Sequence, residues 1–377
     1  MKYRKLGKTG IECSLLGFGC MRLPEKKVRN KTVVDRDTAI AIIRRGIDLG
    51  INYVDSAYFY HGGESEVVLG QALKDGYRKK VYLSTKLPTG RVNEPYDFDR
   101  LLDEQMKKLD VDSIDFYHFH YLNQNLFDEK VKGMKLIDRM QKAKAEGLIE
   151  HIAFSFHDKP EVLKQIIDMG WFESMLVQYN LLDRSNEDMI QYARQQGLGV
   201  TVMGPIGGGR LGEPSKAIQE LLPNKNFSSP EIALKFVFSN PYITCALSGM
   251  GTLEMVEENA RIASSDHLLT NEELQQMNVL ADEYKAQSKL YCTECKYCMP
   301  CPNEVNIPLN FKLMNYYQIY NIPEYARQQY QLIGKVDWMP GKTADACTEC
   351  GECEPKCPQK IPIIEQLKQV AKVFEER

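Results

Sequence analysis

Eight of the eleven cysteines fall in two short segments, residues 292–301 and 347–357. Cysteines in the first segment follow one another at every third position, and Pro302 comes next. Thiols this closely spaced suit metal ligation in a reducing compartment better than a disulfide scaffold, whose cysteines are scattered through a short secreted chain. The predicted metal ligands are Cys292, Cys295, Cys298, Cys301, Cys347, Cys350, Cys353 and Cys357.

The spacing also indicates which metal group these thiols hold. The second segment reads Cys-x2-Cys-x2-Cys-x3-Cys-Pro, the spacing of [4Fe–4S] ligands in bacterial ferredoxins; the first is one residue shorter before its last cysteine. Four-thiolate zinc sites are the main alternative, but the third CxxC step and the terminal Cys-Pro favour iron–sulfur clusters. In two-cluster ferredoxins each cluster takes three thiolates from one run and one from the other. This rule predicts two sets: Cys292, Cys295, Cys298 and Cys357; and Cys347, Cys350, Cys353 and Cys301.

A second group of reactive side chains lies in the first third of the sequence. Asp55, Lys86 and His120 each end a short apolar run, and Tyr60 follows Asp55 by five residues. A tyrosine has an ordinary pKa of about 10, and a nearby lysine ammonium, kept charged by an aspartate, favours its ionised form. Such a group can deliver a proton to a carbonyl oxygen while a hydride reaches the carbon, with the histidine orienting the carbonyl.

The elements that would position these residues follow a regular alternation. Short apolar runs, many of them rich in β-branched or aromatic residues, alternate with longer segments of helical period, which predicts parallel strands buried on both faces. Eight strand–helix repeats predict an α/β fold, a closed (β/α)8 TIM barrel of about 250 residues, whose active site forms at the carboxyl ends of the strands. The predicted strands span residues 15–21, 51–57, 81–86, 113–120, 151–156, 174–180, 198–204 and 243–249.

The main alternative to a closed barrel is an open doubly wound sheet. Such a sheet would show GxGxxG after its first strand, and "GFGCMRLP" at residues 17–24 lacks the third glycine.

The ends of the predicted barrel can also be assigned. Residues 2–17 predict a hairpin that plugs the barrel floor, and a helix near 270–286, capped by Thr270 or Asn271, closes the domain. We therefore divide the chain into a barrel, 1–286, and a cysteine-rich domain, 287–377.

Composition limits the classes of protein to which the chain could belong. The 377 residues include 48 basic and 51 acidic side chains, which gives no electrostatic footprint for nucleic acid. No apolar run approaches the roughly 18 residues that span a bilayer, and the first residues show no apolar secretion signal. We expect a cytoplasmic protein that binds neither nucleic acid nor membrane.

The segment "GINYVDSAYFYHGGESEVVLGQAL", residues 50–73, resembles the signature of the aldo–keto reductases. The opening "RKLGKTGIECS" and the segment "LSGMGTLEMVEEN" at 247–259 extend the resemblance over roughly residues 1–285. It implies that Asp55, Tyr60, Lys86 and His120 form the catalytic tetrad, with Tyr60 as general acid or base and NAD(P)H as hydride donor. His118 faces the same side of its strand as His120, but the spacing from Asp115 places His120 in the family position.

The same resemblance implies a set of cofactor contacts. Ser155 and Gln178 are similar to residues that hold the nicotinamide amide, and Met203 takes a position where many members stack a tyrosine. Residues 202–212, "VMGPIGGGRLG", resemble the loop over the pyrophosphate, and residues 247–259 resemble the adenosine end. The predicted cofactor-binding residues are Gly19, Met21, Asp55, Ser155, Gln178, Met203, Gly204, Gly208, Arg210, Gly249, Glu258 and Asn259.

Two positions bear on the choice between NADH and NADPH. Gly249 and Met255 stand where NADP-specific relatives often carry lysine and arginine, and an arginine fork is well suited to a 2′-phosphate. We therefore expect a preference for NADH. No flavin motif is present, although flavin sites on barrels need no short motif.

The whole chain resembles aldo–keto reductases fused to a mostly α-helical ferredoxin-like domain, since the segment between the cysteine groups, 309–334, is helical in pattern and broken at Pro323. The resemblance implies an NAD(P)-dependent oxidoreductase acting on a small carbonyl or alcohol substrate, with two [4Fe–4S] clusters that exchange electrons with a redox partner protein. Two alternatives remain: a carbonyl reductase whose clusters are structural, and a redox-sensing or binding module with little turnover.

Overall fold

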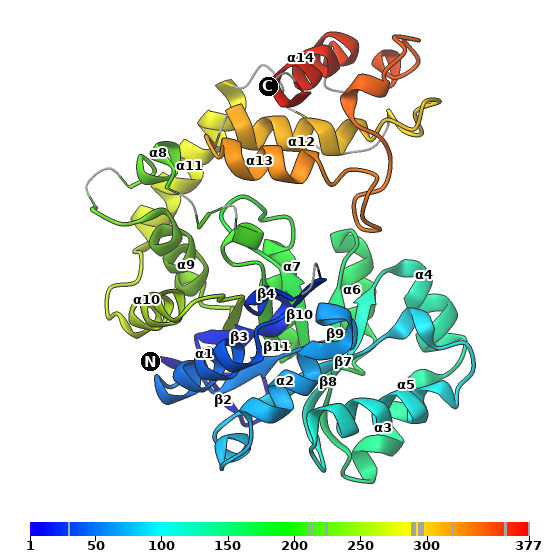
Figure 1. Cartoon of the computed structure of the whole chain (residues 1–377), viewed down its shortest axis with the longest axis vertical. Helices are drawn as coiled ribbons and strands as arrows, with labels where there is room; N and C mark the ends of the chain where they lie inside the picture. The colour runs from blue at the N-terminus through cyan, green and yellow to red at the C-terminus, as the bar shows by residue number, and fades with distance from the viewer. Residues whose placement is uncertain are drawn as a thin grey trace. The chain divides into compact units, whose positions relative to one another are not determined.

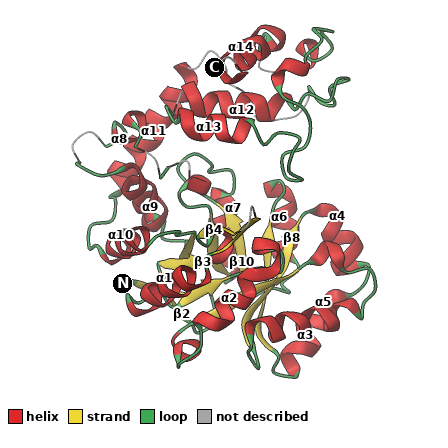
Figure 2. Cartoon of the chain, viewed as in Figure 1, coloured by secondary structure: helices red, strands yellow, loops and turns green. Residues whose placement is uncertain are grey.

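The computed structural model divides the chain into two compact units. The first contains Met1–Gly208 and Ala233–Leu269, and the second contains Gly209–Ile232 and Thr270–Arg377. Figure 2 shows the strands in the first unit and helices in the second. The structure describes residues 1–28, 31–209, 211–212, 214–222, 225–287, 292, 298–318, 320–357 and 360–375.

The first unit is a closed parallel barrel, as the alternation of apolar runs predicts (Figure 1). Around the barrel the strands follow the order β10-β11-β12-β3-β6-β7-β8-β9, so neighbours in sequence are neighbours in space and the last strand closes on the first. Their bounds are β3 (Leu16–Gly19), β6 (Tyr53–Asp55), β7 (Tyr82–Leu87), β8 (Ile114–Leu122), β9 (Ile149–Phe156), β10 (Ser174–Gln178), β11 (Gly199–Met203) and β12 (Cys245–Ser248).

Helices connect successive strands and cover the outside of the barrel. Helix α3 (Asp97–Leu109) shows why: Phe98, Leu101, Leu102 and Leu109 recur at helical spacing and are all buried, so this stripe lies against the sheet. The other connecting helices are α1 (Arg36–Asp48), α2 (Glu64–Ala72), α4 (Gln124–Leu126), α5 (Leu136–Ala145), α6 (Pro160–Asp168), α7 (Glu187–Gln196), α9 (Ser229–Ser239) and α10 (Leu253–Ser264).

The predicted hairpin at the start of the chain closes the amino-terminal end of the barrel. Strands β1 (Tyr3–Lys5) and β2 (Glu12–Ser14) pair antiparallel. Leu6 and Ile11, at the turn, are buried with barrel residues such as Phe116 and Leu176. The floor is therefore filled by apolar side chains, which leaves the carboxyl ends of the strands for a site.

A second hairpin, β4 (Glu25–Val28) with β5 (Lys31–Val34), was not expected from the sequence. The side chains of β4 are all exposed, so the strand carries no alternating apolar pattern. The hairpin follows β3 directly and therefore extends the loop at the carboxyl end of the first barrel strand.

The second unit is built from helices α8 (Lys216–Gln219), α11 (Asn271–Gln287), α12 (Ile307–Gln318), α13 (Pro323–Tyr330) and α14 (Ile363–Glu375). Thr270 caps α11 in a reciprocal box: Glu273 N donates to Thr270 Oγ1 and Thr270 N donates to Glu273 Oε2. Pro323 begins α13 and separates it from α12, as expected. Helix α11 lies in this unit rather than with the barrel.

None of the helices in the described part of the chain is long and apolar enough to cross a membrane.

Candidate active site

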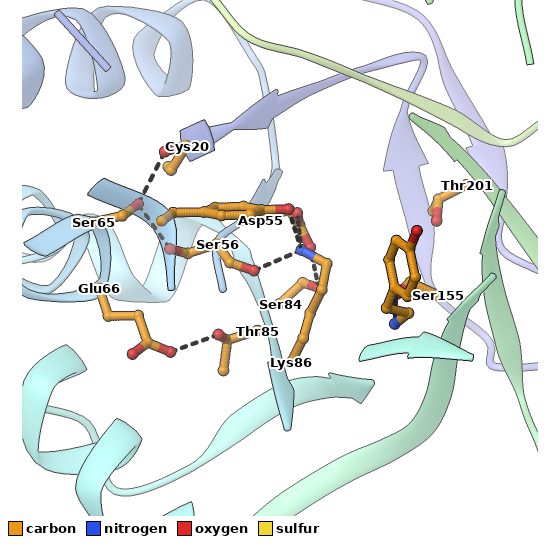
Figure 3. A network of polar contacts seen from close by, with 12 residues as sticks. Cys20, Asp55, Ser56, Ser65, Glu66, Ser84, Thr85, Lys86, Ser155 and Thr201 are labelled. Atoms are coloured by element: carbon orange, nitrogen blue, oxygen red, sulfur yellow. Dashed lines mark hydrogen bonds and ion pairs between the residues drawn. The ribbon is translucent and has the colours of Figure 1, made fainter. Parts of the chain in front are cut away.

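The centre of the site is an ion pair between Lys86 and Asp55 at the carboxyl ends of two neighbouring strands (Figure 3). Asp55 pairs in register with Ser84, so Lys86 stands two residues further along β7 on the same face. Lys86 Nζ lies 2.5 Å from Asp55 Oδ2, and Ser84 Oγ donates to Asp55 Oδ1 at 2.7 Å. Lys86 is 1% exposed and Asp55 3% exposed.

All three hydrogen-bond donors of the Lys86 ammonium have an acceptor. Besides Asp55, Lys86 Nζ donates to Ser56 O at 2.6 Å and to Tyr60 Oη at 3.4 Å. Burial is the largest single effect and lowers the pKa of Lys86, but the Asp55 carboxylate and the Tyr60 hydroxyl together outweigh it, so the pKa lies above its usual value. Lys86 is therefore a buried ammonium directed at the hydroxyl of Tyr60.

Tyr60 begins a short 3₁₀ turn, Tyr60–Gly63, just after β6. Partial burial raises the pKa of its phenol, and the opposing effect of Lys86 does not cancel this, so the pKa lies above the ordinary 10.0. The sequence predicts the sign of the lysine's contribution, but burial outweighs it. Tyr60 is therefore protonated at neutral pH.

His120, on β8, completes the group. Its ring meets the Tyr60 ring edge to face, with centroids 6.2 Å apart. Burial, and then the positive charge of Lys86, hold the pKa of His120 well below 6.5. The imidazole is neutral, so it can donate one hydrogen bond to a carbonyl oxygen without adding charge.

His118 lies in a different environment from His120. It is 0% exposed, and neither ring nitrogen has a hydrogen-bond partner among the described residues. Burial lowers the pKa of His118 to about 3. Strand alternation does not decide which histidine belongs to the site, because both face the same side of β8. Burial distinguishes them: His118 lies in the interior of the barrel, and His120 is half-buried at its edge.

Predicted nicotinamide contacts gather at the ends of the next strands. Ser155, at the end of β9, accepts a hydrogen bond from Tyr121 N at 2.8 Å. Gln178 and Met203 stand opposite each other at the ends of β10 and β11. Gly204 follows with a φ of 62°, and a Cβ there would lie 2.8 Å from Gln178 Nε2, so the amide lies flat against this glycine.

His157 comes directly after β9, two residues beyond Ser155. Its ring stacks on Tyr121, with centroids 4.4 Å apart and an angle of 22° between the planes. Tyr121 is itself 49% exposed. The pair therefore forms an exposed aromatic wall at the ends of β8 and β9.

The other predicted cofactor residues lie around the ends of β3, β11 and β12. Gly19 ends β3, and Met21 is 57% exposed in the turn that follows. Gly208 has a φ of 68°, a conformation that favours glycine. Gly249 comes directly after β12.

At the predicted adenosine end, Glu258 and Asn259 lie in α10. Asn259 is buried and its Nδ2 donates to Ser248 Oγ at 3.3 Å, so its amide is tied to the end of β12. Arg210, the remaining predicted contact, lies outside the described residues.

A network behind Lys86 was not expected from the sequence. Glu66, on α2, is 0% exposed; its Oε1 accepts from Thr85 Oγ1 at 2.7 Å and from Gln105 Nε2 at 2.5 Å. Gln105 Nε2 also reaches Lys86 O at 3.1 Å, and Tyr117 Oη donates to Gln105 Oε1. The one signal in the sequence is a glutamine on the apolar stripe of α3.

In the second unit, five of the described thiols line one cavity, together with Ile307 of α12 and Leu367 of α14. These thiols are Cys298, Cys301, Cys347, Cys350 and Cys353. Cys292 and Cys357 are half-buried nearby in sequence, and Cys295 lies outside the described residues. None of the cysteines in the described ranges forms a disulfide.

This donor set can be compared with what a cluster needs. Soft thiolates are the ligands of iron–sulfur clusters, and all four members of one predicted set, Cys301 with Cys347, Cys350 and Cys353, line the same cavity. The donors that line this cavity are therefore of the kind that a cluster takes.

Comparison with known proteins agrees with this architecture. Residues 15–282 match the aldo/keto reductase family, and residues 291–362 match the 4Fe-4S dicluster domain. An uncharacterized oxidoreductase of Bacillus subtilis (strain 168), YqkF, is 28% identical over 324 residues, covering 76% of this chain and 99% of that protein. The L-galactose dehydrogenase of Arabidopsis thaliana is 29% identical over 286 residues, covering 69% and 87%.

Among solved structures, the holo form of the aldo-keto reductase AKR11C1 from Bacillus halodurans is 28% identical with a TM-score of 0.64. It covers 74% of this chain, and this chain covers 96% of it. The family match extends over most of the chain and includes the strands that carry Asp55, Lys86 and His120. The chain therefore belongs to the aldo/keto reductase family, as an oxidoreductase that carries a 4Fe-4S dicluster domain after its barrel.

Proposed function

We propose that the barrel interconverts a small carbonyl compound and its alcohol, with Tyr60 as general acid and base. The observation that carries this proposal is the arrangement of the Lys86 ammonium, whose three donors meet Asp55, Ser56 and Tyr60. A nicotinamide dinucleotide, when bound, supplies or accepts the hydride. The protein must then supply or accept one proton at the substrate oxygen.

Each side chain has a definite part in that proton transfer. In reduction, Tyr60 Oη gives its proton to the carbonyl oxygen; in oxidation it takes the proton back. The phenolate left behind lies beside the Lys86 ammonium, which stabilises it. Asp55 keeps Lys86 charged, and neutral His120 donates a hydrogen bond that orients the carbonyl. The raised pKa of Tyr60 ensures that the proton is present before reduction begins.

The cofactor assignment is part of this proposal. Ser155 and Gln178 would hold the nicotinamide amide, with Met203 against the ring. Ser155 Oγ already accepts one hydrogen bond, which leaves its own hydrogen free to donate. The glycines at 19, 204, 208 and 249 leave room for close approach, and Asp55, Met21, Arg210, Glu258 and Asn259 complete the set. Because Gly249 and Met255 carry no charge, we propose a preference for NADH.

Deuterium labelling tests the proposed reaction directly. NADH that carries deuterium at C4 is incubated with the cluster-loaded protein and a panel of aldehydes and ketones. The proposal expects deuterium on the carbinol carbon of the product when the label is on one face of the nicotinamide C4, and none when the label is on the other face. Product that carries no deuterium at that carbon with either label would show that the barrel does not transfer hydride to a carbonyl.

We further propose that residues 287–377, which belong with α11 to the second unit, form a domain that holds two [4Fe–4S] clusters. The first would be ligated by Cys292, Cys295, Cys298 and Cys357, and the second by Cys301, Cys347, Cys350 and Cys353. When bound, such clusters carry single electrons, so a redox partner protein is part of the proposal. All four thiols of the second set line the thiol cavity, which Cys298 of the first set also lines.

A structural role is the second candidate, because the cavity joins both cysteine segments to α12 and α14 through Ile307, Ile364 and Leu367. Electron paramagnetic resonance of the cluster-loaded protein, before and after NADH and without carbonyl, separates the two roles. A reduced-cluster signal after NADH supports electron exchange between nicotinamide and clusters. No signal, while dithionite still reduces the clusters, supports structural clusters.

A further inference from the structure

The segment that follows β11 belongs to the second unit rather than with the strand that it leaves. Residues Gly209–Ile232 group with Thr270–Arg377, whereas Gly208 lies in the first unit. Met203, Gly204 and Gly208, three residues of the proposed cofactor set, come shortly before this segment in the chain. Because the chain is continuous, a contact that holds the segment also restrains the backbone that the cofactor would approach.

Ser215 connects this segment to the cysteine-rich domain. It is 1% exposed, and its Oγ donates to Tyr320 O at 2.6 Å, across 105 residues of sequence. The same Oγ accepts a hydrogen bond from Ile218 N at 3.3 Å and so caps α8. The hydroxyl of Ser215 therefore donates to the cysteine-rich domain and accepts from its own segment.

The rest of the segment is also packed into the second unit. Ile218, Leu221 and Leu222 are each no more than 3% exposed. Further along, Lys225 Nζ lies 3.0 Å from Glu273 Oε1 of α11, but this ion pair is partly exposed and contributes little. The bond from Ser215 is the stronger of these two polar ties, because both of its residues are buried and water does not compete for it.

Helix α12 links this buried bond to the thiol cavity. Its first residue, Ile307, lines the cavity. At its other end, Tyr320 N donates to Asn315 O at 3.3 Å and Ile322 N donates to Tyr316 O at 3.1 Å, so the backbone on both sides of the Tyr320 carbonyl is bound to the helix. The 12 residues of α12 span about 18 Å. One helix therefore runs from the cavity to the carbonyl that accepts the bond.

The start of α12 is bound to the chain around the second cysteine segment. Asn310 is 0% exposed and its Nδ2 donates to Lys342 O at 3.2 Å, an oxygen that also accepts from Asn306 N at 3.1 Å. Just before the helix, Asn303 Nδ2 donates to Thr348 Oγ1 at 2.6 Å, and Thr348 lies within the second cysteine segment. The position of α12 therefore depends on how the two cysteine segments are held together.

From this chain of contacts we infer that Ser215 is a positioning residue for the cofactor, and that the state of the cysteine-rich domain acts on cofactor affinity through it. When the two cysteine segments are held together, α12 presents the Tyr320 carbonyl and Ser215 holds the segment after β11 in the form that binds a nicotinamide dinucleotide. When they are not, fewer molecules have the held form, and the apparent affinity falls in proportion. The inference rests on the proposed function and extends it.

A binding cycle on the full-length protein tests the inference. The dissociation constant of NADH is measured by isothermal titration for the wild-type protein and for Ser215→Ala, each in cluster-loaded and cluster-free form. In the loaded protein, Ser215→Ala should raise the dissociation constant on the order of fivefold, as expected for the loss of one buried hydrogen bond. Removing the clusters from the wild-type protein should raise it at least as much. In the cluster-free protein the substitution should add less than about twofold, because the bond is already lost.

Two further variants show whether the effect belongs to this bond. Ser215→Thr keeps the hydroxyl and should bind NADH within about twofold of the wild-type protein. Ser14→Ala is the matched control: Ser14 is 0% exposed, and its Oγ donates to Leu16 O at 2.7 Å and accepts from Asn52 N at 3.1 Å at the barrel floor. It removes bonds of the same kind, so it should lower stability and leave the dissociation constant unchanged.

Amide hydrogen exchange over residues 214–222, measured on the same samples, reports on the segment without any cofactor. Exchange there should rise in Ser215→Ala and in the cluster-free wild-type protein, but not in Ser14→Ala. Two results would overturn the inference: an equal loss of affinity from Ser215→Ala in the loaded and cluster-free proteins, or exchange over this segment that does not respond to cluster removal. If the loaded wild-type protein binds no NADH, the proposed function itself fails, and exchange still shows whether the cysteine-rich domain holds the segment.

Discussion

At the scale of single residues, the proposed chemistry depends on Lys86. Types and spacing predict the four side chains of the site, because each ends a strand or follows one in a recognisable order. Their protonation could not be predicted in the same way. Burial reverses the simple expectation for Tyr60, whose pKa rises even with an ammonium at 3.4 Å. The balance between desolvation and charge depends on packing, which the sequence does not display.

The pKa directions predict how the rate of reduction depends on pH. His120 has a pKa well below 6.5 and Tyr60 a pKa above 10.0. Neither group changes its charge between them, so kcat for carbonyl reduction should be flat from about pH 6.5 to about pH 9. It should fall only as pH rises through the pKa of Tyr60, where the proton donor is lost. An acidic limb near pH 6.5 that His120→Asn removes would contradict this account.

At the scale of elements, the barrel strands are predictable because strands buried on both faces leave short apolar runs in the sequence. The β4–β5 hairpin was missed because its exposed side chains leave no such run. The contacts between α2, α3 and β7 were also missed. Glu66 looks like an ordinary surface residue in the sequence, and the only signal for Gln105 is its place on the apolar stripe of α3; their placement on buried helix faces brings them together.

This network predicts a specific loss of stability. Gln105→Leu removes one donor to Glu66 and the acceptor of Tyr117 Oη, and leaves both groups buried. The free energy of unfolding should fall by about 2–4 kcal/mol, measured by urea unfolding of the cluster-loaded protein. Gln141→Leu, at an exposed position on α5, should change it by less than about 0.5 kcal/mol. Equal effects of the two substitutions would show that the network does not stabilise the fold.

At the scale of the whole molecule, the cysteine spacing predicts the ligands, but it predicts how they are shared only through the rule for two-cluster ferredoxins. Sharing is a property of three-dimensional placement. The cavity brings Cys298 and Cys301, from the first segment, together with Cys347, Cys350 and Cys353 of the second. This arrangement supports the exchange of the fourth ligand between segments that two-cluster proteins use.

Paired substitutions test the exchange. Cys301→Ser should lower the iron content from about eight to about four atoms per chain, because it removes one cluster of four irons. Adding Cys347→Ser should cause no further loss, since both thiols serve the same cluster. Cys13→Ala, in the barrel floor, should leave the iron unchanged. If the double variant loses all its iron, Cys301 belongs to the other cluster and the proposed sets are wrong.

In the proposed mechanism Tyr60 transfers the proton, while other residues bind the cofactor. The most direct measurement is kcat for carbonyl reduction by Tyr60→Phe, with the dissociation constant of NADH measured on the same cluster-loaded protein. The account predicts that kcat falls by about 10²- to 10⁴-fold, the usual contribution of a positioned acid, while the dissociation constant changes by less than about twofold. Turnover close to that of the wild-type protein would contradict it.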